Sequence, residues 1–385
     1  MRIYFDHNAT TPVAPAVVEA VCRVLGDDYG NPSSVHHFGQ RAKGLLDEAR
    51  SAVADLIGSE PSELVFTSGG TEADNFAVRG VAEVLESTGR RHLVASAIEH
   101  EAVLNTVKAL VRRGWTASYL PVDGTGIVRP EALEAALTPG TALVSVMHAN
   151  NEIGTVQPIA ELAEIARRRG VLFHTDAVQS VGKVPVAVGE LGVDLLSLSA
   201  HKFNGPKGAG ALWIRRGARL NAILTGGKHE RNRRAGTENV AGIVGLGVAA
   251  RLAVQKLEEE GRRLGALRDR LEQLVLERVP GTAVNGAREP RVPNTTNISF
   301  DSVEAESLLI ALDLEGIAVS TGSACSSGTL EPSHVLRAMG LPSHRTQNSI
   351  RISLGAGNTP AEVETFVARL PGIVEKLRGL VRAVR

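Results

Sequence analysis

Short apolar runs alternate with amphipathic helical patterns through most of this chain, and the alternation constrains the fold more than any other feature. Repeated strand–helix units favour a mainly parallel sheet with helices packed on both faces. Seven strands are predicted, at residues 64–67, 92–95, 117–120, 143–147, 171–175, 195–199 and 211–214. We therefore expect an α/β fold whose ligands bind beyond the carboxyl ends of these strands.

The pattern changes in the last third of the chain. A long charged amphipathic helix is predicted from about residue 245 to 278, followed by a strand at 296–300, a helix at 304–314, a strand at 349–353 and a closing helix at 360–382. We expect a large domain over residues 15–255. Residues 1–14 and 256–385 are expected to form a smaller α+β domain.

Composition argues against several classes of partner. Acidic and basic residues balance at 42 each, so charge gives no reason to expect binding to nucleic acid or an anionic membrane. No apolar run approaches the roughly 20 residues that span a bilayer. The first residues lack the apolar core of a signal peptide, and two cysteines cannot build a disulfide framework. These observations predict a cytoplasmic enzyme.

Lys202 is the first candidate for chemistry. It follows a predicted buried strand at 195–199, in the segment Ser199-Ala200-His201-Lys202. A lysine leaving the end of such a strand points its amine into a cleft, where burial lowers the pKa and makes the amine a nucleophile. A solvated His201-Lys202 pair in a loop is the alternative for this segment taken alone.

The strand before it ends in Asp176, with Gln179 three residues later. Pyridoxal 5'-phosphate needs a lysine for its aldehyde, a carboxylate for its ring nitrogen and donors for its phenolate oxygen. Asp176 taken alone would more simply cap a following helix. Asp176 and Gln179, together with Ser199, His201 and Lys202, are not explained by capping and predict this cofactor.

The turn Ser68-Gly69-Gly70-Thr71 lies between a predicted strand and a predicted helix, and it is the candidate phosphate seat. Glycines there let backbone amides approach an anion, and the helix N-terminus adds a favourable dipole. An ordinary turn with Thr71 and Glu72 as helix cap remains open. The turn is neither a dinucleotide fingerprint nor a Walker loop.

Two further residues suggest a substrate with sulfur and a carboxylate. Cys325 lies in a loop of small polar residues, whereas Cys22 is predicted to lie on a buried helix face among valines. Most free cysteines are inert, so Cys325 alone would not define a site. Arg351, on a predicted strand, suits bidentate binding of a carboxylate, although a surface ion pair is the alternative.

These motifs together resemble the NifS/IscS family of pyridoxal-phosphate-dependent cysteine desulfurases, and the NifS branch particularly. The resemblance runs nearly end to end and implies the fold of type I transferases of this cofactor, with a mainly parallel seven-stranded sheet. It is carried by the segments 4–12, 67–75, 99–100, 148–154, 174–179, 199–208, 234–239 and 323–336. His7 departs from the family, which often has asparagine at this position.

The resemblance implies roles around the cofactor ring. His100 would stack on the ring and transfer protons, and Asp176 would pair with the ring nitrogen. Asn151 and Gln179 would hold the phenolate side, while Lys202 would bind the aldehyde covalently.

The resemblance also implies the phosphate and substrate contacts. Gly70 belongs to the phosphate turn. Thr71, Ser199 and His201 would bind the phosphate, joined by Thr237 of the partner subunit in a homodimer. Asn151 and Arg351 would bind L-cysteine.

The implied activity is conversion of L-cysteine to L-alanine. Cys325 would accept the sulfur as a persulfide and pass it to an iron–sulfur scaffold or another acceptor protein. The resemblance implies no metal in the cofactor chemistry, although Cys325 would be able to ligate an iron–sulfur cluster transiently. A selenocysteine lyase or aminotransferase of the same fold remains an alternative, as does a non-enzymatic docking hub.

Overall fold

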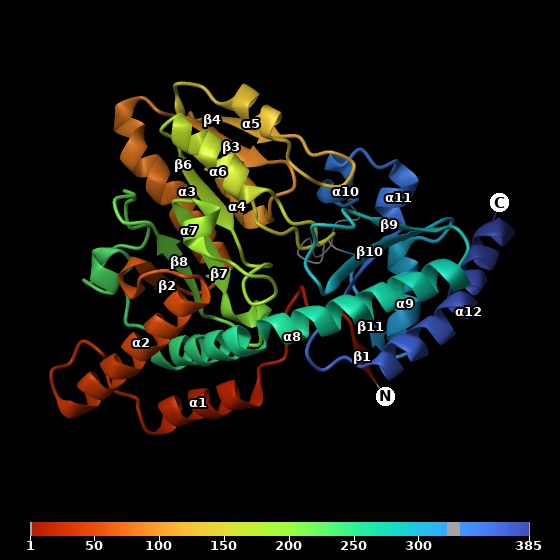
Figure 1. The fold of residues 1–385 in the computed structure, drawn as a ribbon, viewed down its shortest axis with the longest axis horizontal. Helices are drawn as coiled ribbons and strands as arrows, with labels where there is room; N and C mark the ends of the chain where they lie inside the picture. Colours follow the sequence, from red (N-terminus) through yellow and green to blue (C-terminus); the bar gives the residue numbers. More distant parts are fainter. Residues whose placement is uncertain (1, 322–331, 385) are drawn as a thin grey trace.

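The computed structural model describes residues 2–321 and 332–384, and its larger part is built around a seven-stranded sheet (Figure 1). The strands lie side by side in the order β2 (Leu64–Thr67), β8 (Gly210–Ile214), β7 (Leu195–Ser199), β6 (Leu172–Asp176), β5 (Thr141–Ser145), β3 (His92–Ser96) and β4 (Thr116–Leu120). Only β8 runs antiparallel to its neighbours in this sheet, so the predicted fold class is confirmed.

The helices and short 3-10 turns of the described residues complete the chain. The helices are α1 (Pro15–Gly26), α2 (His37–Leu56), α3 (Gly70–Leu85), α4 (Glu101–Val111), α5 (Pro130–Ala136), α6 (Ile159–Arg168), α7 (Val188–Leu191), α8 (Val240–Arg278), α9 (Ala305–Leu314), α10 (His334–Ala338), α11 (Ser343–Gln347) and α12 (Pro360–Val384). The 3-10 turns are η1 (Pro61–Glu63), η2 (Glu86–Thr88), η3 (Ala200–Lys202) and η4 (Glu230–Asn232).

Both faces of the large sheet are covered, which explains why its central strands are apolar at nearly every position. Successive residues of a strand point to opposite faces. Leu196 therefore packs in the core shared with α2, α6 and α8, whereas Leu195 packs with α3 and α4 on the other face.

A smaller part gathers the C-terminal elements and the first residues of the chain. It contains the antiparallel sheet β12 (Ser349–Ser353), β10 (Thr295–Phe300) and β9 (Thr282–Asn285). β1 (Ile3–Tyr4) pairs in parallel with β11 (Ile317–Ala318), which carries Phe5 into a core with Phe300 and Phe366. The N-terminal segment is thus held close to both parts of the molecule.

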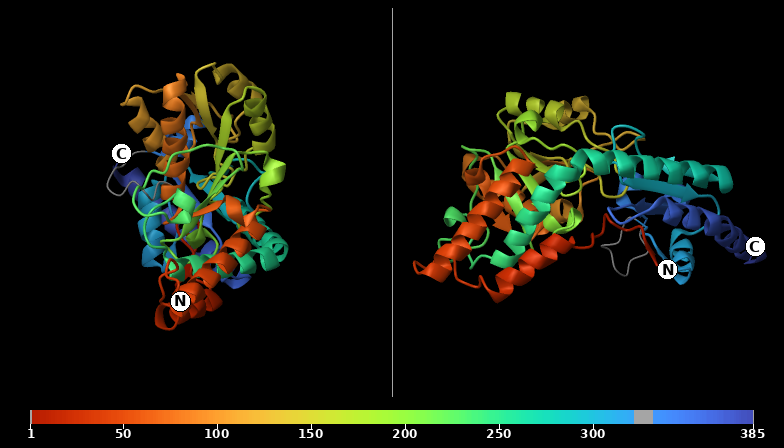
Figure 2. Two further views of the ribbon diagram at one scale, coloured as in Figure 1. Left: turned by 90° about the vertical axis from the view of Figure 1, so that its left-hand side faces the viewer. Right: turned by 60° about the horizontal axis from the view of Figure 1, so that its bottom comes forward.

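Helix α8 joins the two parts along the length of the molecule (Figure 2). It begins five residues before the predicted start at 245, because the Asn239 side chain accepts a hydrogen bond from Gly242 N and caps it. Among the described residues, this helix alone is long and apolar enough to cross a membrane. Half of the most apolar 18-residue stretch of α8 is buried. The helix packs against α1 and α2, so core packing accounts for its apolar composition.

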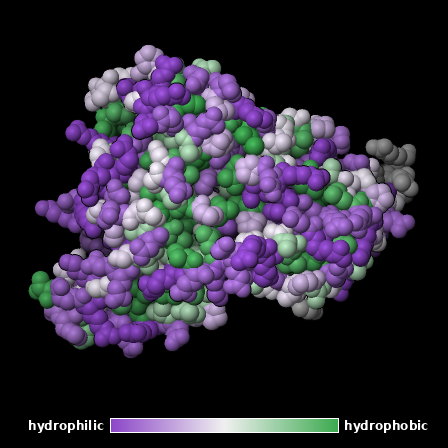
Figure 3. All heavy atoms as spheres, in the orientation of Figure 1, coloured by the Kyte–Doolittle hydropathy of each residue, from purple (hydrophilic) through white to green (hydrophobic). Residues whose placement is uncertain are grey.

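The surface is largely hydrophilic in the view of Figure 3, with apolar residues gathered near the middle of this face. The prediction that Cys22 is buried is wrong, because its side chain is exposed. Helix α1 carries two apolar stripes, and Val17 and Val24 on one of them are buried. Cys22 lies on the other stripe with Val18 and Leu25, which are also exposed.

Candidate active site

Lys202 and Asp176 lie at the carboxyl ends of two adjacent central strands. Asp176 is the last residue of β6, and η3 carries Lys202 directly after β7. Lys202 Nζ donates hydrogen bonds to the backbone oxygens of Asn8 (2.7 Å) and Ala9 (2.9 Å). The amine therefore lies against the N-terminal segment and does not extend into solvent as a loop pair would.

Asp176 caps no helix, since a series of turns follows β6. Its Oδ1 accepts a hydrogen bond from Val178 N at 2.9 Å, and the side chain is buried. Burial raises the pKa of Asp176, while the nearby His100 and Lys202 act to lower it. A buried carboxyl group at this position suits a protonated ring nitrogen as its partner, because an opposite charge stabilises the carboxylate.

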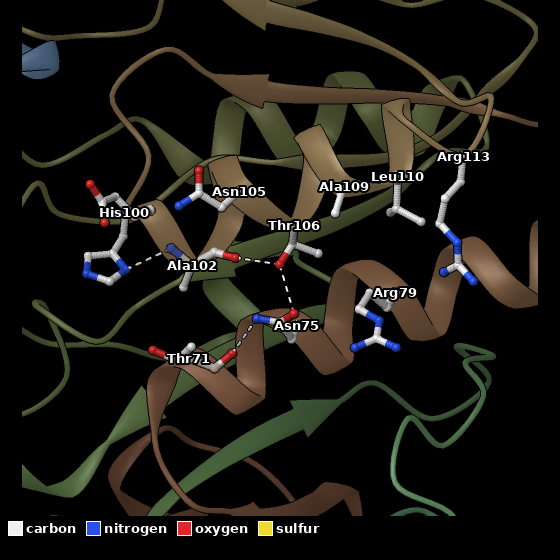
Figure 4. A pocket seen from close by; sticks show the side chains of 11 residues that line it. Thr71, Asn75, Arg79, His100, Ala102, Asn105, Thr106, Ala109, Leu110 and Arg113 are labelled. Atoms are coloured by element: carbon white, nitrogen blue, oxygen red, sulfur yellow. Dashed lines mark hydrogen bonds between the residues drawn. The ribbon is translucent and has the colours of Figure 1, made fainter. Parts of the chain in front are cut away.

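His100 begins helix α4, and its Nδ1 accepts a hydrogen bond from Ala102 N at 3.1 Å (Figure 4). Since Nδ1 is an acceptor, the proton of the neutral ring lies on Nε2. Burial lowers the pKa of His100, with Lys202 acting in the same direction and Asp176 opposing. His100 also lines a cavity of about 570 Å³ together with Thr71.

The glycine turn leaves room for an anion at the start of α3. Gly69 has a φ of +149°, and no side chain caps the first turn of this helix. A Cβ at Gly70 would lie 2.7 Å from Val178 Cγ2, so glycine is required by this close approach. Glu72 reaches back to Ser68 N at 2.8 Å, as in a capping interaction, and leaves the Thr71 hydroxyl for a ligand.

Ser199 and His201 lie near the same strand ends. Ser199 Oγ is 3.6 Å from the position that a Cβ on Gly69 would occupy, which places this hydroxyl beside the glycine turn. His201 Nδ1 contacts Thr10 Oγ1 at 3.1 Å, and burial, with Lys202 nearby, lowers its pKa to about 4. Its ring is therefore neutral near pH 7.

Arg351 is buried, so the alternative of a surface ion pair is excluded. Nη1 donates to Asn151 O at 3.1 Å, and Nη2 donates to Asp6 Oδ1 at 2.7 Å. Nε is buried and has no hydrogen-bond partner among the described residues. A buried guanidinium with an unused donor is suited to an anionic ligand.

An amide network missed by sequence reasoning joins these groups. Gln179 Nε2 donates to Asn8 O at 3.0 Å, and Lys183 Nζ donates to Gln179 Oε1 at 2.6 Å. Lys183 lies four residues after Gln179 in a run of turns, and that short spacing was the only signal in the sequence. His7 packs beside this network against the Tyr4 ring, and its side chain is buried.

Two predicted site residues, Thr237 and Cys325, are not placed beside Lys202 and Asp176 by the described part of one chain. Thr237 is exposed in the loop before α8. That loop is anchored by a buried bidentate pair between Arg50 and Glu230 and by a pair between Arg234 and Glu72. Cys325 lies outside the described residues.

A family model for aminotransferase class-V matches residues 3–366. This chain belongs to the aminotransferase class-V family. It is 50% identical over 377 residues to a curated relative from Dictyoglomus turgidum named cysteine desulfurase IscS, covering 98% of this chain and 95% of the relative. A relative from Trichormus azollae named cysteine desulfurase is 51% identical over 378 residues, covering 98% of this chain and 94% of the relative.

The fold comparison agrees. A solved structure titled NifS-like protein superposes with a TM-score of 0.92 at 40% identity, covering 97% of this chain and all of that chain. The family depends on pyridoxal 5'-phosphate, as predicted from Lys202 and Asp176. The residues present fit this cofactor, because an uncapped helix start, a buried carboxylate and a lysine amine converge at neighbouring strand ends.

Proposed function

We propose that this protein is a cysteine desulfurase that converts L-cysteine to L-alanine and retains the sulfur as a persulfide on Cys325. The observation that carries the proposal is the placement of Asp176 and Lys202 at adjacent strand ends. It occurs in a chain about half identical, over 98% of its length, to curated cysteine desulfurases.

The positions of the side chains support the following cofactor contacts. Lys202 would bind the cofactor aldehyde, and Asp176 would hold the protonated ring nitrogen. Thr71, Ser199 and the first amides of α3 would hold the phosphate. When bound, pyridoxal phosphate supplies an electron sink that acidifies the substrate Cα proton and labilises its Cβ–S bond.

Arg351 is assigned to the substrate carboxylate, because it is buried and its Nε has no hydrogen-bond partner among the described residues. The backbone oxygen of Asn151 accepts a hydrogen bond from Arg351 Nη1. His100 Nε2 is the atom available for proton transfer, since Nδ1 is held by Ala102 N.

The sulfur step is a transfer between two thiols and needs no external oxidant. The Cys325 thiolate attacks the substrate sulfur, so an S–S bond forms while the Cβ–S bond breaks. The electron pair of that bond takes up a proton at Cβ. The net change is L-cysteine plus the Cys325 thiol giving L-alanine plus the Cys325 persulfide.

A homodimer with shared active sites is part of the proposal. Thr237 is exposed in a loop whose base is fixed by two ion pairs, which favours contact with the phosphate of the partner subunit. The persulfide sulfur would pass to an iron–sulfur scaffold or another acceptor protein in the cytoplasm.

The test is to incubate the purified protein, loaded with pyridoxal phosphate, with L-cysteine and a thiol reductant. Equal amounts of alanine and sulfide are expected. An aminotransferase would instead need a keto-acid acceptor and release no sulfide. A docking hub without cofactor would remain colourless and form no alanine.

A further inference from the structure

Lys183 is a half-buried side chain to which the proposed chemistry gives no role. It lies in the turns after β6, and its Nζ donates to Gln179 Oε1 (2.6 Å) and to Asn8 Oδ1 (3.0 Å). Burial lowers its pKa well below the ordinary value, and the positive charges of Lys202 and Arg351 act in the same direction. A neutral amine and an ammonium both have at least two N–H donors, so both contacts persist in either state.

These contacts determine which way the Gln179 amide faces. Its oxygen lies on Lys183 Nζ, and its nitrogen donates to Asn8 O at 3.0 Å. Turning the amide over would place two acceptors against each other at Asn8 O and, when Lys183 is protonated, two donors against each other at Lys183. Both partners therefore select the same orientation.

Asn8 is fixed in the same way. Its Oδ1 accepts from Lys183 and from Asn294 Nδ2 at 3.1 Å, so its own Nδ2 donates to Thr295 Oγ1 (2.8 Å) and to Asn151 O (3.1 Å). Asn8, Gln179 and Asn294 are buried, and a buried polar group left without its partner is costly. Loss of the Lys183 amine would take the Lys183 donor from Gln179 Oε1 and leave Asn8 Oδ1 with the donor from Asn294.

The Gln179 NH2 group lies close to the Lys202 amine. The same Asn8 backbone oxygen that accepts from Gln179 also accepts from Lys202 Nζ at 2.7 Å. The amine assigned to the cofactor aldehyde and the amide donor thus meet at one atom. Lys183 and Lys202 both line a cavity of about 500 Å³, together with His7 and Lys256.

We propose that Lys183 is a positioning residue that holds the Gln179 amide with its NH2 group toward the phenolate oxygen of the bound cofactor. The inference rests on the proposed function, in which Gln179 faces that oxygen. Lys183 acts through Gln179 and does not itself touch the reacting atoms.

The experiment is a double-mutant cycle with Lys183→Met and Gln179→Met, read from the visible absorption band of the cofactor-loaded protein as a function of pH. A donor at a phenolate oxygen favours its charged form, so loss of the donor should move the spectral midpoint to higher pH. Each single variant should show this shift, and cofactor affinity should fall about 5- to 30-fold. The double variant should show little beyond Gln179→Met alone.

Lys256→Met is the matched control, because Lys256 lines the same cavity but is exposed. Lys256→Met should keep the wild-type spectral midpoint. Lys183→Arg keeps N–H donors, so its midpoint should lie close to that of the wild type. If Lys183→Met does not fold, Lys183→Leu, which also lacks an N–H donor, serves in the same cycle. A wild-type midpoint in the Lys183 variant, or shifts that add fully in the double variant, would overturn the proposal. Alanine formation by the wild type is measured separately and tests the desulfurase function independently.

Discussion

Replacing Asp176 with asparagine removes one negative charge while leaving the local shape intact. The asparagine oxygen can still accept the hydrogen bond from Val178 N, which Asp176 Oδ1 now accepts at 2.9 Å. What is lost is the charge-assisted hydrogen bond to the cofactor ring nitrogen. Asp176 is buried, so solvent cannot replace that charge.

A hydrogen bond to a charged group contributes about 1.5–3 kcal/mol. At about 1.36 kcal/mol per tenfold change in rate, its loss should slow alanine formation by about 10- to 150-fold. The assay is initial-rate alanine formation from L-cysteine at saturating cofactor. The visible band should persist, because Lys202 is unchanged.

Asp194→Asn is the matched control for this prediction. Asp194 is also buried, but it lies at the opposite end of the sheet, where it accepts a hydrogen bond from Phe173 N and pairs with Arg215. It should lower the melting temperature and leave kcat near the wild-type value. An Asp176→Asn rate within about threefold of wild type, well short of the predicted loss, would refute the assignment of this carboxylate to the ring nitrogen.

Three further predictions concern the amine, the dimer and acid stability. Lys202→Ala should abolish both alanine formation and the visible band at a near-native melting temperature, and residual turnover would argue against its role. Mixing inactive Lys202→Ala with inactive Thr237→Ala subunits should restore activity through heterodimers, whereas no recovery after subunit exchange would argue against a shared site. Burial lowers the pKa of His148 to about 4 and that of His174 to about 3, from 6.5. The unfolded chain therefore binds more protons below pH 6.5, so the melting temperature should fall as pH drops toward 4, and His148→Gln should flatten that slope.

Much of the fold was predictable because local patterns and the tertiary structure agree. β2 and β7 have the predicted bounds, since both are fully buried runs that end at turn residues. β5 begins two residues before its predicted start, because Thr141 is buried and paired although its side chain is polar. Cys22 was wrongly placed, since two apolar stripes on α1 look alike in sequence and only packing decides which is covered.

The site was predictable where one residue carries the chemistry and less so where it depends on contacts distant in sequence. Asp176 ends one buried strand and Lys202 follows the next, and their combination with Gln179, Ser199 and His201 indicated a site. The network of Lys183, Asn8 and Asn294 was missed, because it joins the first residues of the chain to segments more than 170 positions away. The ion pair between Arg351 and Asp6 was missed for the same reason, because the two residues are far apart in the sequence.

The central claim is that sulfur leaves L-cysteine by transfer to Cys325. Its most direct test is peptide mass analysis after a brief incubation of the cofactor-loaded protein with L-cysteine, with Cys325→Ala assayed in parallel. The proposed function predicts one added sulfur on the peptide containing Cys325, removable by a thiol reductant. It also predicts that Cys325→Ala keeps the spectral response to L-cysteine but loses alanine formation. An added sulfur on Cys22 instead, or undiminished desulfuration by Cys325→Ala, would contradict the claim and favour a lyase.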